Sequence, residues 1–207
     1  MCEFEVFVSK ADFKFSCAHF ISYKGFRERL HGHNYQASIK IIGSDTLNAD
    51  GYVIDFGDIK KEARSLCKSI NEFFICPMKS STLDITENDG NICLVCEDGA
   101  RFSFPRSDCA LLPIVHSSAE EISHWLWCGI VRGIGLNKFK ERNLKSMEVS
   151  VAEATNQQAT FRCLIPSSEE ELFGIESRQL QKRPPPHPCL LPSSAADNIT
   201  TTSDSTV

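Results

Sequence analysis

The hydrophobic pattern between residues 13 and 165 changes its period in an order that strongly constrains the fold. Residues 13–19 and 31–41 alternate apolar and polar side chains, as do 146–153 and 158–165, which is typical of strands with one buried face. Residues 56–70 and 122–130 place apolar side chains three or four positions apart, which is typical of helices. Asp55 precedes the first helix, and residues 118–121 form a capping box before the second. The order β-β-α-α-β-β predicts an α+β fold, an antiparallel sheet with two helices on one face.

Two segments lie outside this pattern. Residues 91–105 contain two apolar runs around a Glu-Asp-Gly turn at 97–99, which predicts an additional hairpin. Residues 166–207 hold most of the nine prolines, including the run at 184–188, and many Ser and Thr residues. Such a composition buries too little apolar surface to offset the entropy of ordering the chain. We therefore expect a folded domain over 1–165 and a disordered Pro/Ser/Thr-rich tail over 166–207.

The composition limits the partners and the cellular compartment that we expect for the protein. The chain has 207 residues and a net charge of −5, and this acidic balance argues against nucleic acid as its main partner. It has no apolar run of about 18 residues, which argues against a membrane span. The start of the chain lacks the basic and apolar regions of a secretory signal, so we interpret the ten cysteines as reduced thiols of a cytoplasmic protein.

Three histidines interrupt the apolar faces of the first two strands. His19 ends the apolar face of the first strand, and His31 and His33 begin that of the second. In an antiparallel hairpin these three imidazoles lie at the same end and on the same face, because residues two apart on a strand project in the same direction. Three neutral imidazoles with an open fourth position are typical of a catalytic zinc site. The alternative is one hydrogen-bonded core histidine and two that cap the loop.

Glu153 is a second polar interruption, because it continues an apolar face at the end of the strand over 146–153. A buried carboxylate is costly unless it is paired or hydrogen-bonded. A ligand edge with several N–H donors, such as a pterin or a guanine, would satisfy it with two hydrogen bonds. A salt bridge to a neighbouring chain or to Arg162 is the alternative.

Several short motifs give the chain a resemblance to a known family. They appear in the following order: Phe15-Ser16-Cys17-Ala18-His19, Leu30-His31-Gly32-His33-Asn34-Tyr35, Gly51-Tyr52-Val53-Ile54-Asp55-Phe56, Ser118-Ala119-Glu120 and Val151-Ala152-Glu153. Over about 10–165 the chain resembles the 6-pyruvoyl-tetrahydropterin synthase family, which includes the bacterial 6-carboxytetrahydropterin synthases.

The resemblance implies a fold, an assembly, a metal and a substrate. The fold is the tunnelling fold (T-fold), which assembles through its sheet edges into trimers that commonly stack as hexamers. The metal is Zn²⁺ on His19, His31 and His33, and the substrate is 7,8-dihydroneopterin triphosphate. Recognition of the pterin carries over to Glu153, with Ser117 and Ser118 in place of the usual threonine-bearing turn.

The loop over 20–30 would then serve the substrate's triphosphate. Lys24, Arg27 and Arg29 supply positive charge and bidentate contacts suited to phosphate. A solvated loop without a phosphate ligand is the alternative.

The same loop departs from the family at the catalytic base. Family members usually place a cysteine four residues before the His-Gly-His motif as the proton acceptor, but Arg27 stands there in this chain and Glu28 follows it. Relatives with a glutamate in this loop resemble enzymes that cleave the substrate side chain to 6-hydroxymethyl-7,8-dihydropterin. We expect Glu28 to be the base, and an ion pair between Glu28 and a flanking arginine is the alternative.

The family's Asp-His proton relay is also replaced. Asn71 and Glu72 stand in its place, which makes Glu72 a second catalytic candidate. His116 is a further candidate base. His124 is expected on the solvent side of its helix.

The expected function is that of a zinc-dependent lyase. It would convert 7,8-dihydroneopterin triphosphate to 6-pyruvoyl-tetrahydropterin with loss of triphosphate, a step in tetrahydrobiopterin biosynthesis. Two alternatives remain: cleavage to the 6-hydroxymethyl product for folate biosynthesis, or a binding module that keeps zinc and pterin without catalysis. The expected partners are the pterin triphosphate and further copies of the chain, with no nucleic acid and no membrane.

Overall fold

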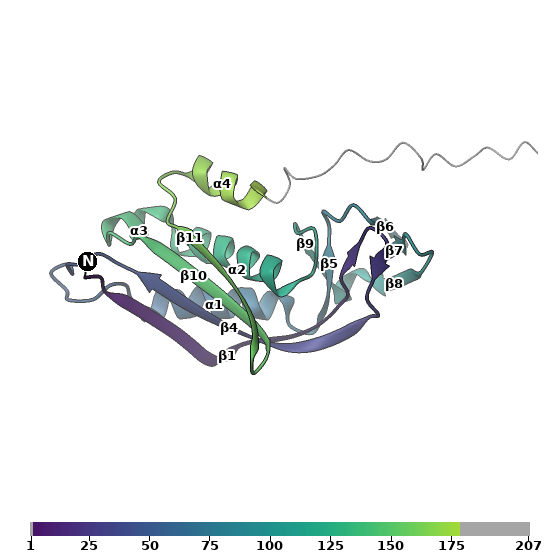
Figure 1. Cartoon of the computed structure of the whole chain (residues 1–207), viewed down its shortest axis with the longest axis horizontal. Helices are drawn as coiled ribbons and strands as arrows, with labels where there is room; N and C mark the ends of the chain where they lie inside the picture. Colours follow the sequence, from purple (N-terminus) through teal and green to yellow (C-terminus); the bar gives the residue numbers. More distant parts are fainter. Residues whose placement is uncertain (1, 179–207) are drawn as a thin grey trace, which may run out of the picture.

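The computed structural model describes residues 2–178, and residue 1 and residues 179–207 lie outside the described part. One long sheet forms the frame of the molecule (Figure 1), in the strand order β11-β10-β4-β1-β5-β9. Its strands are β1 (Glu5–His19), β4 (His31–Ile42), β5 (Phe73–Pro77), β9 (Cys109–Leu112), β10 (Ser146–Ala154) and β11 (Gln157–Leu164). The pairs β1–β4, β4–β10 and β10–β11 are antiparallel, whereas β5 runs parallel to both β1 and β9.

Two helices cover one face of this sheet. Helix α1 (Phe56–Ile70) packs on β1, and α2 (Ala119–Ile134) packs on β10 and β11. Both begin where the sequence predicts, because the Asp55 carboxylate accepts from the amide of Gly57 and the Ser118 hydroxyl accepts from that of Glu121. A short helix, α3 (Leu136–Glu141), follows α2. The predicted α+β T-fold with two helices on one face is therefore confirmed, but the sheet is mixed rather than wholly antiparallel, because β5 pairs in parallel with β1 and β9.

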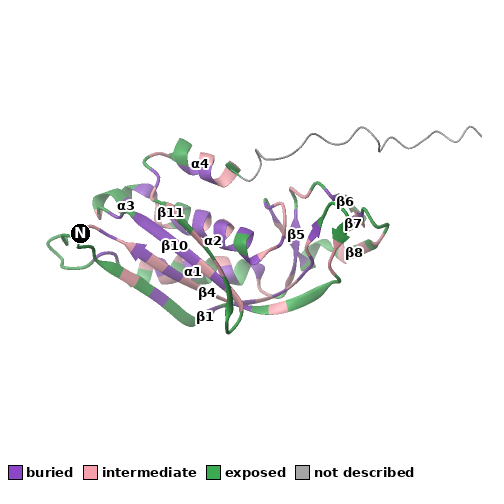
Figure 2. Ribbon diagram, viewed as in Figure 1, coloured by how far each residue is buried: buried purple, intermediate pink, exposed green. Residues whose placement is uncertain are grey.

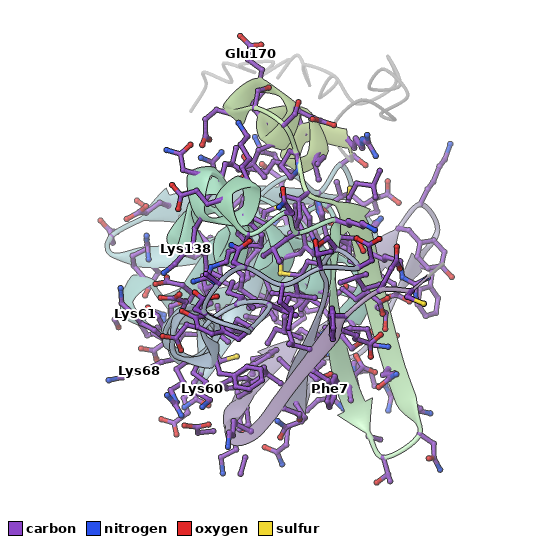
Figure 3. All side chains as sticks on the ribbon, turned by 90° about the vertical axis from the view of Figure 1, so that its left-hand side faces the viewer. Phe7, Lys60, Lys61, Lys68, Lys138 and Glu170 are labelled. Carbon is purple, nitrogen blue, oxygen red and sulfur yellow. The ribbon has the colours of Figure 1, made fainter. Side chains whose placement is uncertain are left out.

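The core lies between the sheet and the two helices, where buried residues alternate along the strands (Figure 2). Helix α2 approaches α1 closely through two glycines: a Cβ on Gly129 would lie 2.8 Å from a methyl carbon of Leu66, and one on Gly133 would overlap Glu62. The other face of the sheet is open, and Phe7 is 59% exposed there (Figure 3). No helix among residues 2–178 is long and apolar enough to cross a membrane.

The predicted hairpin at 91–105 is confirmed as β7 (Asn91–Cys96) and β8 (Arg101–Pro105). A further strand, β6 (Leu83–Asn88), extends it to a three-stranded sheet, which is followed by the 3-10 turn Arg106–Asp108. The loop over 20–30 is itself a small hairpin, β2 (Ser22–Tyr23) and β3 (Phe26–Arg27).

The prediction that the tail is disordered from residue 166 is wrong at its start. Residues 169–177 form helix α4 (Glu169–Ser177), which packs against α2 with Leu172 and Ile175 buried. Its first turn is capped by the hydroxyl of Ser168. Two apolar residues three positions apart suffice to anchor one short helix, and the average composition of a 42-residue tail conceals them. The Pro-rich run at 184–188 lies outside the described residues.

Candidate functional site

The three predicted histidines form one cluster at the end of the β1–β4 hairpin. His19 lies directly opposite His31 in the strand register, and His33 lies opposite Cys17. One nitrogen from each ring lies within 4.8 Å of the other two. The alternation along two neighbouring strands therefore brings the three side chains together as predicted.

Backbone carbonyls fix the orientation of two of these rings. The Nδ1 atom of His19 lies 2.7 Å from the carbonyl oxygen of Ser117, and that of His31 lies 2.7 Å from the carbonyl oxygen of Arg29. A carbonyl only accepts hydrogen bonds, so each Nδ1 carries a proton, and in the neutral ring each Nε2 then keeps its lone pair. Burial lowers the pKa of His19, and the neighbouring His31 and His33 act in the same direction. Neutral imidazoles are the form that binds a metal ion.

The environment of His19 Nε2 tests whether a metal fits here. Its neighbour is the Tyr35 hydroxyl at 3.1 Å, and that hydroxyl also lies 3.0 Å from the Glu153 carboxylate. Burial raises the pKa of Tyr35, so the hydroxyl keeps one proton to share between two acceptors. The charged carboxylate is the stronger acceptor, which leaves the buried Nε2 lone pair without a donor among residues 2–178. A cation would satisfy it, so the residues fit a divalent metal that prefers imidazole.

Glu153 reaches this cluster because β10 is bulged at its position. The register between β10 and β11 shifts between Ala152 and Ala154, which leaves Glu153 unpaired and half-buried. Bulges of this kind redirect a side chain next to a functional site. Arg162 pairs instead with Glu148, at 2.7 Å, so the alternative pairing of Arg162 with Glu153 is wrong.

Ser117 and Ser118 have structural partners. The buried Ser117 hydroxyl donates to the carbonyl oxygen of Phe20 at 2.9 Å, while its own carbonyl accepts from His19. Ser118 caps α2. Ser117 therefore holds His19 in place from the start of α2.

Glu28 is half-buried at the base of the β2–β3 hairpin. Its carboxylate accepts from the amide of Ile21 at 3.0 Å, and its own amide donates to the carbonyl of Ile21 at 2.9 Å. Its charge contributes to the raised pKa of Tyr35, whose hydroxyl contacts His19. Arg27 pairs with Asp98 at 2.8 Å, so the alternative ion pair between Glu28 and a flanking arginine is not formed by Arg27.

The other two candidate bases are Glu72 and His116. Glu72 follows α1 with φ 68° and donates its amide to the carbonyl of Ser16 at 2.6 Å. It lines an open cavity of about 460 Å³ together with His33 and Asn34. His116 precedes α2, and its buried Nδ1 has no hydrogen-bond partner in the described chain. No hydrogen bond among residues 2–178 joins either of them to the three histidines.

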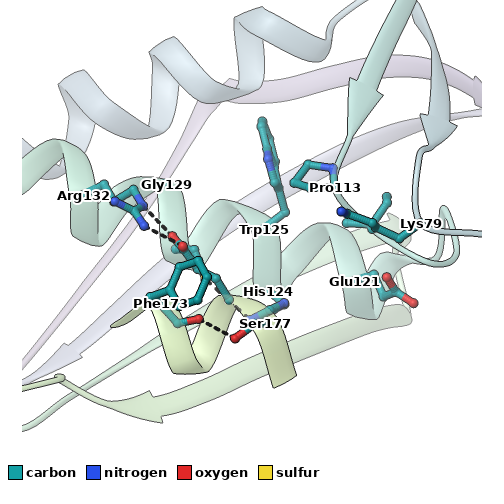
Figure 4. Close-up of a pocket in the computed structure, with 12 residues that line it drawn as sticks. Lys79, Pro113, Glu121, His124, Trp125, Gly129, Arg132, Phe173 and Ser177 are labelled. Atoms are coloured by element: carbon teal, nitrogen blue, oxygen red, sulfur yellow. Dashed lines mark hydrogen bonds and ion pairs between the residues drawn. The ribbon is translucent and has the colours of Figure 1, made fainter. Parts of the chain in front are cut away.

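A second cavity of about 400 Å³ lies between α2 and α4 (Figure 4). His124, on its wall, is buried rather than solvent-facing as predicted, because α4 covers α2 and the carbonyl of Ile175 lies 3.1 Å from its Nε2. None of the three clustered histidines lines this cavity.

Sequence reasoning assigned no role to Tyr35, although the signal was present. Tyr35 shares the parity of His31 and His33, so it had to lie on the same face. A buried tyrosine hydroxyl usually finds a hydrogen-bond partner, and here it joins His19 to Glu153.

Comparisons with known proteins agree with this geometry. Residues 8–163 match the sequence model of the family described as 6-pyruvoyl tetrahydropterin synthase. The Plasmodium vivax enzyme of that name is 43% identical, with 80% of this chain and 100% of that chain covered and a TM-score of 0.76. Its Plasmodium falciparum counterpart is 40% identical over the same shares, with a TM-score of 0.77.

Other relatives extend the comparison. A Methanocaldococcus jannaschii protein, provisionally named 6-carboxy-5,6,7,8-tetrahydropterin synthase, is 26% identical over 155 residues, which cover 73% of this chain and 91% of that protein. Two further P. vivax structures, each 42% identical, are described as variants in which a catalytic glutamate is replaced by alanine or cysteine. By the extent of the family match and these identities, the chain belongs to the 6-pyruvoyl tetrahydropterin synthase family.

Proposed function

We propose that the protein is a zinc-dependent lyase that converts 7,8-dihydroneopterin triphosphate to 6-pyruvoyl-tetrahydropterin and releases triphosphate. The observation that carries this proposal is the chain of contacts from His19 through Tyr35 to Glu153, which sets a metal-binding cluster beside a carboxylate. The family membership and the names of the Plasmodium relatives support the reaction class.

His19, His31 and His33 would hold the metal. When bound there, zinc supplies Lewis-acid polarisation of substrate oxygens. The two Nδ1–H groups bonded to backbone carbonyls keep the rings in the tautomer that leaves Nε2 available.

Glu153 would bind the pterin ring. A carboxylate accepts two parallel N–H bonds, which matches the edge of a pterin. The Tyr35 hydroxyl occupies one lone pair of Oε1 and so orients the carboxylate. Ser117 and Ser118 contribute to this site through the backbone at the start of α2, because their hydroxyls are already engaged.

Glu28 would be the base that accepts a proton from the substrate. One of its oxygens is engaged by the amide of Ile21, and the other is the one we assign to the substrate. The catalytic glutamate named for the P. vivax enzyme supports a carboxylate in this role. Glu72, which lines a cavity with His33, and His116 are second choices, because Glu28 is next to the position of the family's usual catalytic cysteine.

Glu28 also favours a second candidate reaction, cleavage of the substrate side chain to 6-hydroxymethyl-7,8-dihydropterin. A glutamate and the family's usual cysteine differ by about four units in their unperturbed pKa values. That difference in basicity can change which substrate proton is removed and therefore which bond breaks. The first product leads towards tetrahydrobiopterin and the second towards folate.

Incubating the purified protein with 7,8-dihydroneopterin triphosphate and identifying products by mass decides between the two reactions. Glu28→Gln keeps the shape of the side chain and removes its basicity, so turnover is expected to fall at least about 100-fold with little change in pterin binding. Glu170→Gln, at an exposed position of α4 (Figure 3), is the matched control and should leave turnover unchanged.

Two outcomes would overturn parts of this proposal. Turnover of Glu28→Gln close to that of the unaltered protein would assign the base elsewhere. Stoichiometric zinc and tight pterin binding without any product would leave a non-catalytic binding module.

We also propose a homo-oligomer, a trimer or a hexamer, in the cytoplasm. The outer strands β11 and β9 each have one paired edge among the described strands, and natural sheets protect such edges by pairing or covering them. The nine cysteines among residues 2–178 are all free thiols, as a reducing compartment requires. Light scattering of the purified protein measures the oligomer's mass.

A further inference from the structure

The hairpin that carries Glu28 rests on the three-stranded sheet β6–β8. Strands of two residues each, as in β2 and β3, cannot hold a fixed position by themselves. The hydroxyl of Thr82, just before β6, lies 3.2 Å from the carbonyl oxygen of Ser22 and 3.0 Å from its hydroxyl. At the tip of the hairpin, the amide of Gly25 donates to the carboxylate of Glu97 at 3.2 Å.

Arg27 forms the most direct link between that sheet and Glu28. Its Nε donates to the Asp98 carboxylate at 2.8 Å, and its Nη1 donates to the backbone carbonyl of Glu28 at 2.9 Å. One rigid guanidinium therefore bridges the β7–β8 turn and the backbone of Glu28. The side chain of Arg27 is 20% exposed and that of Asp98 is 47% exposed, so the bridge is partly shielded from water.

A cluster of aromatic rings packs against the Arg27 guanidinium and anchors it to the main sheet. The Phe20 ring, just before the hairpin, stacks on Phe102 of β8 with centroids 5.0 Å apart. The guanidinium carbon of Arg27 lies 5.6 Å from the Phe102 centroid, within the range of a cation–π contact. Phe104 stacks in turn on Phe74 of β5 at 4.4 Å, which ties the small sheet to the main one.

We propose that the β6–β8 sheet positions the catalytic loop, and that Arg27 and Asp98 are positioning residues that hold Glu28 for its reaction. This inference rests on the proposed role of Glu28 as the base. A base must lie within hydrogen-bond reach of the proton that it accepts, and a displacement of about 1 Å can cost about 100-fold in rate. The β6–β8 sheet thus supplies the rigidity that the eleven-residue surface loop over 20–30 lacks.

This role differs from the phosphate contact that the sequence suggests for Arg27. If Arg27 bound the triphosphate, its loss would mainly raise KM, and removal of Asp98 would free the guanidinium for phosphate. If Arg27 positions Glu28, removal of either partner lowers kcat in the same way. Asp98 is therefore the informative position, because it acts on Glu28 only through Arg27.

The experiment compares Asp98→Ser with Asp50→Ser in the full-length chain. Serine can keep the side-chain bond that Asp98 makes to the amide of Ala100, but it is too short and uncharged to hold Arg27. Asp50 pairs with Arg142 at 2.6 Å, with side chains 38% and 16% exposed, and Arg142 also lies over a ring, that of Tyr52. Asp50→Ser therefore removes a closely similar ion pair that does not involve the loop over 20–30.

For Asp98→Ser we expect kcat to fall at least about 10-fold, with KM within about 2-fold and zinc content unchanged. Hydrogen exchange of the Ile21 and Glu28 amides should become faster. Asp50→Ser should change neither kcat nor the hydrogen exchange of these two amides. Unchanged kcat and exchange in Asp98→Ser would overturn the inference, and so would a lower KM without loss of kcat.

The Glu28→Gln background separates this inference from the proposed function. There, Asp98→Ser should add little further loss of kcat, because the group that it positions no longer acts as a base. Full activity of Glu28→Gln would refute the base, whereas unchanged hydrogen exchange in Asp98→Ser would refute the anchoring alone.

Discussion

Replacing Tyr35 by phenylalanine removes one hydroxyl from the centre of the site and leaves the ring in place. Tyr35 is 1% exposed and its ring stacks on Phe15 with centroids 4.9 Å apart, and a phenylalanine keeps that packing. What is lost is the bond of 3.0 Å to Glu153 and the contact of 3.1 Å with His19 Nε2. The effect therefore reports on the hydroxyl alone.

The magnitude follows from the charge and the burial of the partners. A hydrogen bond to a charged group contributes about 1.5–3 kcal/mol to stability. Glu153 is only half-buried, so water can replace part of the lost bond and the lower end of the range applies. We expect a loss of about 1.5–2 kcal/mol in the free energy of unfolding, or about 3–8 °C in Tm for a domain of this size.

Urea unfolding of the metal-free protein measures this loss. Tyr52→Phe is the matched control, because the Tyr52 hydroxyl also has a charged neighbour, Arg142 at 2.8 Å, but the residue is 42% exposed. It should lose less than about 0.5 kcal/mol. An equally small loss in Tyr35→Phe would show that the hydroxyl does not hold Glu153. Tyr35→Phe should also raise KM for the pterin substrate and keep its zinc, since His19 Nε2 remains available.

Three further predictions follow from the site and from α4. Replacing His33 by alanine should remove most of the bound zinc measured by metal analysis, and stoichiometric zinc in that variant would contradict the predicted ligand set. Leu172→Ala should lower the free energy of unfolding by about 2–5 kcal/mol because Leu172 is fully buried, whereas Phe173→Ala, at a residue 66% exposed, should change it little; equal effects would show that α4 is not packed. The metal-free protein should lose stability as pH falls below about 6.5, because burial lowers the folded-state pKa of His19 and His124. Above that pH the imidazoles are neutral in both the folded and the unfolded state, and below it the unfolded chain takes up protons first. The free energy of unfolding measured in urea should therefore be lower at about pH 6.0 than at about pH 7.5. Equal values at the two pH values would contradict this prediction.

Local chemistry explains which parts of the fold the sequence predicts. The caps at Asp55 and Ser118 mark the helix starts to the residue, because a side-chain oxygen at that position satisfies amides that have no partner within the helix. The alternation along β1 and β4 predicts the histidine cluster, because parity alone decides which side chains share a face.

Other features depend on contacts that no local pattern carries. β5 and β9 are short and almost wholly buried, so they show no alternation that would separate them from loops. Arg27 meets Asp98, which lies 71 positions away in the chain, and only the packing of two hairpins brings them together. The sequence therefore predicts the histidine cluster better than the support of the loop beside it.

The position of all three histidines within one β-hairpin would determine how the proposed metal uptake is coupled to folding. His19 and His33 are fourteen residues apart in the chain, so an unfolded chain that brings their rings together loses only the entropy of closing a short loop. At the proposed zinc site, the unfolded protein would therefore keep affinity for the metal, and binding to that state would subtract from the stabilisation of the folded one. Added zinc should raise Tm by less than its affinity for the folded site implies. During synthesis the hairpin could also take up the proposed zinc ion before β10, which starts at residue 146, has left the ribosome.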